Sequence, residues 1–269
     1  MIGAVVLAAT LLAQPTPSAS PSANDILFRA LARLRSYGTP PYVVYLAQEN
    51  GETHRIAFRG ADEMMNDTML PAGTSLPRAR IYRAFVGPLS YSVHEAIATP
   101  GAAATPQPQS PSDLESTLKT IAVVSSHGHL YNVHVTGTEK IGDRDAYRIA
   151  LSPVRDPDRN AIRDLWVDTT TYDILRADYV YAHPPDVGLV GAEADLTVSF
   201  TTVGNYRIAG RWIAIYHAPD LRTPVYRELR VVKMVFPESL PDWLFDAPLY
   251  ATHRHDGDPD VLRDLFADP

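Results

Sequence analysis

The sequence predicts a mainly β protein of the α+β class, built on a single large curved antiparallel sheet that two helices partly cover. About eleven or twelve segments alternate apolar and polar residues with a period of two, whereas only two segments show helical periodicity. Most of the expected strands are joined by short turns, which favour antiparallel hairpins over parallel βαβ units.

The first residues have the pattern of an export signal. An apolar run covers Ile2–Ala13, and a Pro/Ser-rich stretch follows it. The run is too short for the ~20 residues of a membrane-spanning helix, so no stable membrane span is expected. We therefore predict a signal peptide over 1–13, a spacer over 14–23 and an exported protein, in the periplasm or the extracellular space. A buried N-terminal strand or helix is the alternative.

A helix and a hairpin are expected next. The helix begins at Asn24, which would cap its free amides, and it ends before Gly38. Its apolar stripe needs a partner surface, so we predict that it is a lid helix over the sheet. Asn50-Gly51 lies between two β-rich runs, Tyr42–Gln48 and Thr53–Arg59, and predicts a tight hairpin turn. The lid-helix residues are Ile26, Leu27, Ala30, Leu31 and Leu34.

The middle of the chain predicts two strands, a loop and a second helix. The strands are expected at Ile81–Val86 and Ser90–Ala96. The Pro/Ala/Gln-rich segment 97–112 is interpreted as a mobile loop; a domain boundary is the rival interpretation, but the chain before it is too short and rich in strand edges to close a β domain. A short helix should then start at Ser112, with Leu114, Leu118 and Ile121 on one side.

The second half of the chain has the clearest alternation. Tyr131, Val133 and Val135 alternate with polar residues. The same pattern recurs in two further strands, and four more strands are expected at Ile162–Asp168, Tyr172–Tyr181, Tyr206–His217 and Val225–Phe236. Residues 24–247 are thus interpreted as one domain, and 248–269 as an acidic C-terminal tail.

Composition excludes several classes of function. The net charge of −7 gives no basic surface for a phosphate backbone, so nucleic acid is not an expected partner. The chain has no cysteine, which excludes disulfides, thiolate metal sites, cysteine nucleophiles and an acylated cysteine anchor. Glycine-rich phosphate loops, G-x-S-x-G and H-E-x-x-H are all absent from the sequence.

Two histidine pairs and one carboxylate pair are candidate catalytic or metal-binding groups. His127 with His129, and His253 with His255, could supply metal ligands, but each pair lies beside turn residues where solvated imidazoles are ordinary. Asp164 could pair with Asp168, although Asp168 is better explained as the first residue of a turn. No catalytic residue, no metal and no cofactor is therefore predicted.

One stretch resembles a known family. Residues 138–153 (TEKIGDRDAYRIALSP), followed by Leu165-Trp166-Val167-Asp168 and by residues 172–177 (YDILRA), resemble the LolA/LolB-like outer-membrane lipoprotein-sorting proteins. The resemblance implies an unclosed β-barrel with helices as a lid, holding acyl chains on an apolar concave face during periplasmic transit. No residue that is essential in the family is matched to a position of this chain. The 97–112 loop and the acidic tail are not part of the family pattern.

Alternation selects the residues of the expected ligand face, because residues two apart on a strand share one face of the sheet. Trp212 is included although Ile213 and Ile215 make the other face of its strand apolar too. We hypothesise a non-enzymatic carrier of an acylated ligand, a lipoprotein or a lipid. An exported structural or sensory domain with envelope protein partners, and a His-dependent metal enzyme, are the alternatives. The expected ligand-face residues are Tyr147, Ile149, Leu151, Leu196, Val198, Phe200 and Trp212.

Overall fold

The structure is a computed structural model. It describes residues 21–38, 40–49, 51–59, 63–68, 79–83, 92–95, 130–157, 160–182 and 192–246, with the backbone alone for 63–68, 79–83 and 92–95. Several expectations lie outside these residues: the signal peptide, the loop 97–112, the helix at Ser112, both histidine pairs and the tail 248–269.

The described strands form one twelve-stranded antiparallel sheet, which confirms the predicted fold class. Their order is β5-β4-β3-β2-β1-β12-β11-β10-β9-β8-β7-β6, so two meanders are joined where β1 pairs with β12. The edge strands β5 and β6 do not pair with each other, and the barrel is therefore open. The strands are β1 Tyr42–Glu49, β2 Glu52–Arg59, β3 Glu63–Thr68, β4 Ala79–Arg83, β5 Ser92–Glu95, β6 Tyr131–Ile141, β7 Arg144–Pro153, β8 Ile162–Asp168, β9 Ile174–Tyr181, β10 Glu193–Val203, β11 Tyr206–His217 and β12 Val225–Val235.

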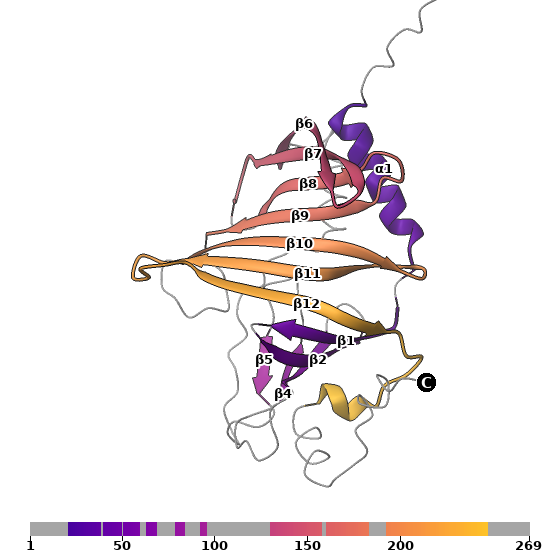
Figure 1. Ribbon diagram of the computed structural model, residues 1–269, viewed down its shortest axis with the longest axis vertical. Helices are drawn as coiled ribbons and strands as arrows, with labels where there is room; N and C mark the ends of the chain where they lie inside the picture. The colour runs from indigo at the N-terminus through magenta and orange to yellow at the C-terminus, as the bar shows by residue number, and fades with distance from the viewer. Residues whose placement is uncertain are drawn as a thin grey trace, which may run out of the picture.

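The sheet is strongly curved. Figure 1 shows β6 to β12 stacked in order from top to bottom, after which β1 and the strands beyond it turn away from the direction of the upper strands. A right-handed twist accumulates from strand to strand, so a sheet of this width curls instead of staying flat.

One α-helix lies within the described residues: α1, Ala23–Ser36. Its N-cap is Ser22, two residues before the predicted cap Asn24. The Ser22 hydroxyl accepts a 3.2 Å hydrogen bond from the Asp25 amide, which satisfies one of the free donors of the first turn. A short 3₁₀ helix, η1 (Asp242–Phe245), follows β12.

The Asn50-Gly51 hairpin is confirmed. Glu49 pairs with Glu52 across the turn, and Gly51 has a φ of +89°, which only glycine adopts without strain. One strand was missed, β3, because its residues EMMNDT include types that are depleted in strands. β9 starts at Ile174 instead of Tyr172, because Tyr172 has a φ of +61° and still belongs to the turn.

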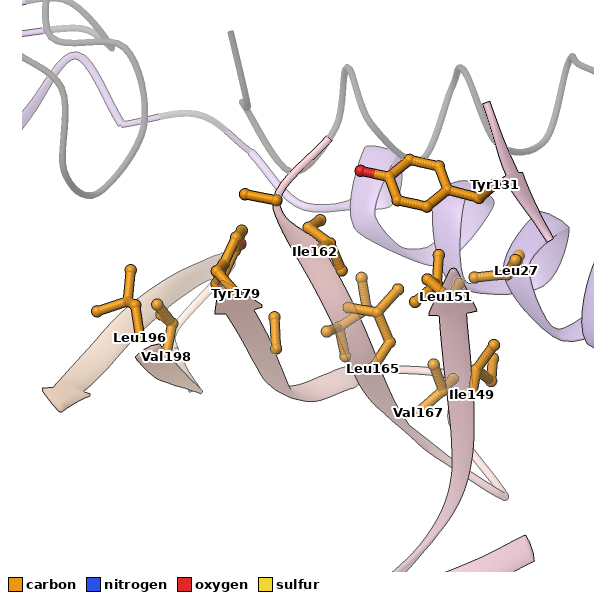
Figure 2. Close-up of a cluster of buried hydrophobic side chains, with 14 of the residues drawn as sticks. Leu27, Tyr131, Ile149, Leu151, Ile162, Leu165, Val167, Tyr179, Leu196 and Val198 are labelled. Carbon is orange, nitrogen blue, oxygen red and sulfur yellow. The ribbon is translucent and has the colours of Figure 1, made fainter. Parts of the chain in front are cut away.

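The main core covers one face of the sheet, which we call the inner face. A row of directly paired residues crosses six strands from β7 to β12 on this face. Directly opposite residues of antiparallel strands point to the same side, so the whole row shares it. Figure 2 shows members of this core on neighbouring strands, with Leu27 of α1 packed beside Leu151. The row is Ile149, Leu165, Ala177, Val198, Trp212 and Leu229.

Candidate ligand-binding face

The structure brings all seven residues of the expected ligand face into one cluster. Ile149, Leu151, Leu196 and Val198 are buried members of the main core, and the other three are partly buried against it. Four of the lid-helix residues belong to the same core, and Leu34 packs on its margin. Alternation along each strand therefore selected residues that share a face in three dimensions.

The cluster has two parts that differ in exposure. Ile149 and Leu151 on β7 are at most 2% exposed and lie against α1 (Figure 2). Leu196 and Val198 on β10 are equally buried. Side chains packed this closely form an ordinary hydrophobic core.

The exposed part lies farther along the sheet, on β10, β11, β12 and β2. Phe200 and Trp212 are half-buried, and half-buried apolar side chains continue from them over a second core cluster formed by Val43, Tyr45, Ala47 and Ile56. The ring of Trp212 lies 6.1 Å from that of Tyr45, which links the two clusters. We call the half-buried set the apolar strip; it consists of Phe58, Phe200, Trp212, Leu229, Val231 and Met234.

Sequence reasoning missed the four strip residues Phe58, Leu229, Val231 and Met234. On β12 the reason is a β-bulge, where Ala47 pairs with Val231 and Leu46 with Lys233. The extra residue, Val232, shifts the alternation, so the inner face continues at Met234 instead of at Lys233. The spacing of apolar residues on β12 is therefore irregular in the sequence, and only the pairing of β12 with β1 resolves it.

The helix α1 covers only the first part of the inner face. Its buried residues belong to the main core, and none of them belongs to the cluster beneath the far end of the strip. A polar cluster fixes its C-terminal end: Arg33 Nε donates to Asp173 Oδ1 at 2.9 Å, and the Tyr37 hydroxyl donates to the same oxygen at 2.6 Å. Beyond the helix, the Gly38 amide donates to the carbonyl of Asn205 at 3.0 Å, in the turn between β10 and β11.

Asp173 is the centre of this polar cluster. Its other oxygen accepts hydrogen bonds from Thr171 at 2.8 Å and from Arg144 at 3.3 Å. Burial alone would raise the pKa of Asp173, but the hydrogen bonds from Tyr37, Thr171, Arg33 and Arg144 outweigh it and lower the pKa to about 2. A carboxylate held this way is charged at neutral pH and fixes the helix to the start of β9.

Asp168 serves the turn before β9, as the sequence predicted. Its Oδ1 accepts from the amides of Thr170 at 2.8 Å and Thr171 at 2.7 Å, and its Oδ2 pairs with Arg144 at 2.7 Å. Asp164 pairs instead with Arg148 at 2.9 Å. The two carboxylates are thus paired with different arginines.

The opposite, outer face of the sheet carries a smaller cluster around Trp166. The guanidinium groups of Arg148 and Arg176 lie 5.3 Å and 4.3 Å from its ring centre, and its indole N–H donates to Glu139 at 3.0 Å. Ala146 and Leu175 are buried beside it. Cation–π contacts and ion pairs of this kind cover this part of the sheet surface.

Within the described ranges, no three His, Asp or Glu side chains converge in a way that could hold a metal ion. In the same part of the chain no helix is both long enough and apolar enough to cross a bilayer. The sites that the structure does assemble are thus the apolar strip and the polar cluster around Asp173.

Several solved structures are similar to this chain in fold. An outer membrane lipoprotein-sorting protein domain from Vibrio parahaemolyticus is 14% identical with a TM-score of 0.46, over 83% of this chain and 96% of that one. A DUF1329 family protein from Desulfovibrio piger is 15% identical with a TM-score of 0.42, over 83% and 95%. A LolA superfamily protein from Nitrosomonas europaea is 14% identical with a TM-score of 0.39, over 84% and 98%. No protein-family model and no curated protein sequence matches the chain.

Proposed function

We propose that this protein is a non-enzymatic carrier or binding module that holds the acyl chain of a lipid or lipoprotein against the apolar strip. The observation that carries the proposal is the contrast between the two parts of the inner face. Ile149, Leu151, Leu196 and Val198 are fully buried, whereas the side chains of the apolar strip remain half-buried.

The continuity of the strip favours an acyl chain over a compact ligand. Trp212 and Leu229 are directly paired neighbours, and Val231 follows on the same face of β12. Apolar surface that remains accessible to water is unfavourable by about 25 cal/mol per Å², and an elongated apolar ligand removes it. The strip therefore suits a flexible hydrocarbon chain lying across neighbouring strands.

A dansyl-labelled undecanoic acid and its methyl ester test the proposal. We expect saturable binding of at least one of them to the wild type and loss of binding in Phe200→Arg, because the charge would lie within the strip. The matched control is Thr201→Arg, since Thr201 is the exposed neighbour of Phe200 on β10. Absence of saturable binding to the folded wild type, or equal losses in both variants, would contradict the carrier function.

A structural or sensory domain with envelope protein partners is the second candidate. The full burial of Ile149, Leu151, Leu196 and Val198 favours it, because these residues show that much of the inner face is already packed. It becomes the better account if neither dansyl probe binds. In either case we propose that the domain acts after export, on the basis of the apolar run Ile2–Ala13. N-terminal sequencing of protein from its native envelope tests this, and an intact Met1 on cytosolic protein would contradict it.

A further inference from the structure

Arg207 lies on the inner face of the sheet, close to the turn that joins β10 to β11. On β10 the residues of the inner face include Leu196, Val198, Phe200 and Thr202. Thr202 is the direct partner of Arg207 on β11. Same-face neighbours on a strand are about 7 Å apart, so the pair formed by Thr202 and Arg207 lies at about this distance beyond Phe200. The Thr202 hydroxyl is also 3.5 Å from that of Tyr37, which places this pair beneath the C-terminal end of α1.

The guanidinium of Arg207 is only partly satisfied by the described residues. It donates from one terminal nitrogen to Thr202 Oγ1 at 2.8 Å and from the other to the carbonyl of Ile174. An arginine has five N–H donors, so three remain after these two bonds. One of the three is Nε, which is buried and has no hydrogen-bond partner.

The charges around Arg207 do not balance. Asp168 and Asp173 are both paired with Arg144, and Asp173 also with Arg33. Arg207 is thus a third guanidinium near Asp173, and no carboxylate of the described residues forms an ion pair with it. Burial lowers the pKa of Arg207, as do the nearby positive charges of Arg144 and Arg33, while the charge of Asp173 opposes them. Arginine nevertheless stays protonated in proteins, so a positive charge without a counterion remains at this end of the strip.

We propose that the ligand is an anionic amphiphile, whose oxyanion head group binds at Arg207 while its acyl chain lies along Phe200 and Trp212. This inference rests on the proposed function and adds the chemical class of the head group. A carboxylate or phosphate oxygen supplies the acceptor that the free N–H groups need, and charge-assisted hydrogen bonds are the strong ones. Arg207 itself is only partly buried, so part of its side chain faces solvent.

The test compares dansyl-labelled undecanoic acid with its methyl ester, in which a methyl group removes the head-group charge. We expect the wild type to bind the acid about tenfold tighter than the ester, the effect of one charge-assisted hydrogen bond. Arg207→Gln should lose this preference without weakening ester binding, and Arg207→Lys should keep part of it. Arg211→Gln is the matched control, since Arg211 lies on the same strand and pairs with Glu228 at 2.8 Å.

Each outcome is informative. Equal binding of acid and ester by the wild type overturns the head-group inference and leaves the carrier function standing, whereas binding of neither probe overturns the carrier function. If Arg207→Gln does not fold, Arg207→Lys decides: a partial loss of acid affinity with unchanged ester affinity supports a head-group contact at this position, and no change in either affinity overturns it. Competition by lysophosphatidic acid but not by monoolein supports a phosphate head, and competition by dodecanoate alone supports a carboxylate.

Discussion

The hydroxyl of Tyr37 donates a 2.6 Å hydrogen bond to Oδ1 of Asp173, a residue 136 positions farther along the chain. This bond joins the end of α1 to the start of β9, and Arg33 adds a second bond to the same oxygen. Because the carboxylate is charged and almost inaccessible to water, the contact holds the helix in place more firmly than a surface ion pair would.

Replacing Asp173 with Asn should lower the free energy of unfolding by about 3 kcal/mol, because Arg33 and Arg144 lose their shared partner in a largely buried site. Urea denaturation followed by circular dichroism measures the change. Asp145→Asn is the control: Asp145 is exposed and pairs with Lys140 at 3.3 Å, so its loss should cost under about 0.5 kcal/mol. Equal effects of the two substitutions would show that the Asp173 cluster does not anchor α1.

Stability should fall in acid through the same residue. The folded-state pKa of Asp173 is about 2, below its ordinary value of 3.8, so the folded state binds this proton less readily than the unfolded chain. Its contribution is fully present above the unfolded pKa and is lost as the pH falls from about 4 to about 2. Denaturation curves across this range should show the difference between wild type and Asp173→Asn shrinking with falling pH. A difference that stays constant from pH 5 to pH 2 would contradict this assignment.

Truncation to alanine should destabilise the protein strongly at one position of α1 and hardly at all at the next. Leu27 is fully buried against the main core, so Leu27→Ala should cost about 3 kcal/mol through lost burial and the cavity left behind. Phe28 is 66% exposed, and Phe28→Ala should change stability by less than about 0.5 kcal/mol. Thermal denaturation of both variants checks the pair, and a larger loss for Phe28 would mean that α1 packs with another face.

Trp212 should report ligand binding by fluorescence. The chain has three tryptophans, and of these Trp212 lies in the apolar strip, whereas Trp166 is buried on the outer face and Trp243 lies in η1. Dodecanoate should therefore shift the emission of the wild type to shorter wavelength, because the chain removes water from the indole of Trp212. The shift should disappear in Trp212→Phe and persist in Trp243→Phe. Persistence in Trp212→Phe would place the ligand elsewhere.

The sequence by itself determined the local elements and the sides that they present. Alternation put Ile149 and Leu151 on one face of β7, the stripe from Ile26 to Leu34 made α1 amphipathic, and Asn50-Gly51 marked a hairpin, because each pattern depends only on neighbouring residues. The fold class followed from the number and type of these elements.

Only the tertiary structure decided which part of the inner face is covered and which stays accessible. The bulge at Val232 places Met234 on the inner face, within the strip. It arises from the register between β12 and β1, which are far apart in the sequence. The pairing of Asp173 with Tyr37 and Arg33, and the uncompensated charge of Arg207, likewise depend on contacts between distant segments. Local periodicity carries no information about such contacts, because a strand pattern fixes the face of a residue and not the residues that come to lie beside it.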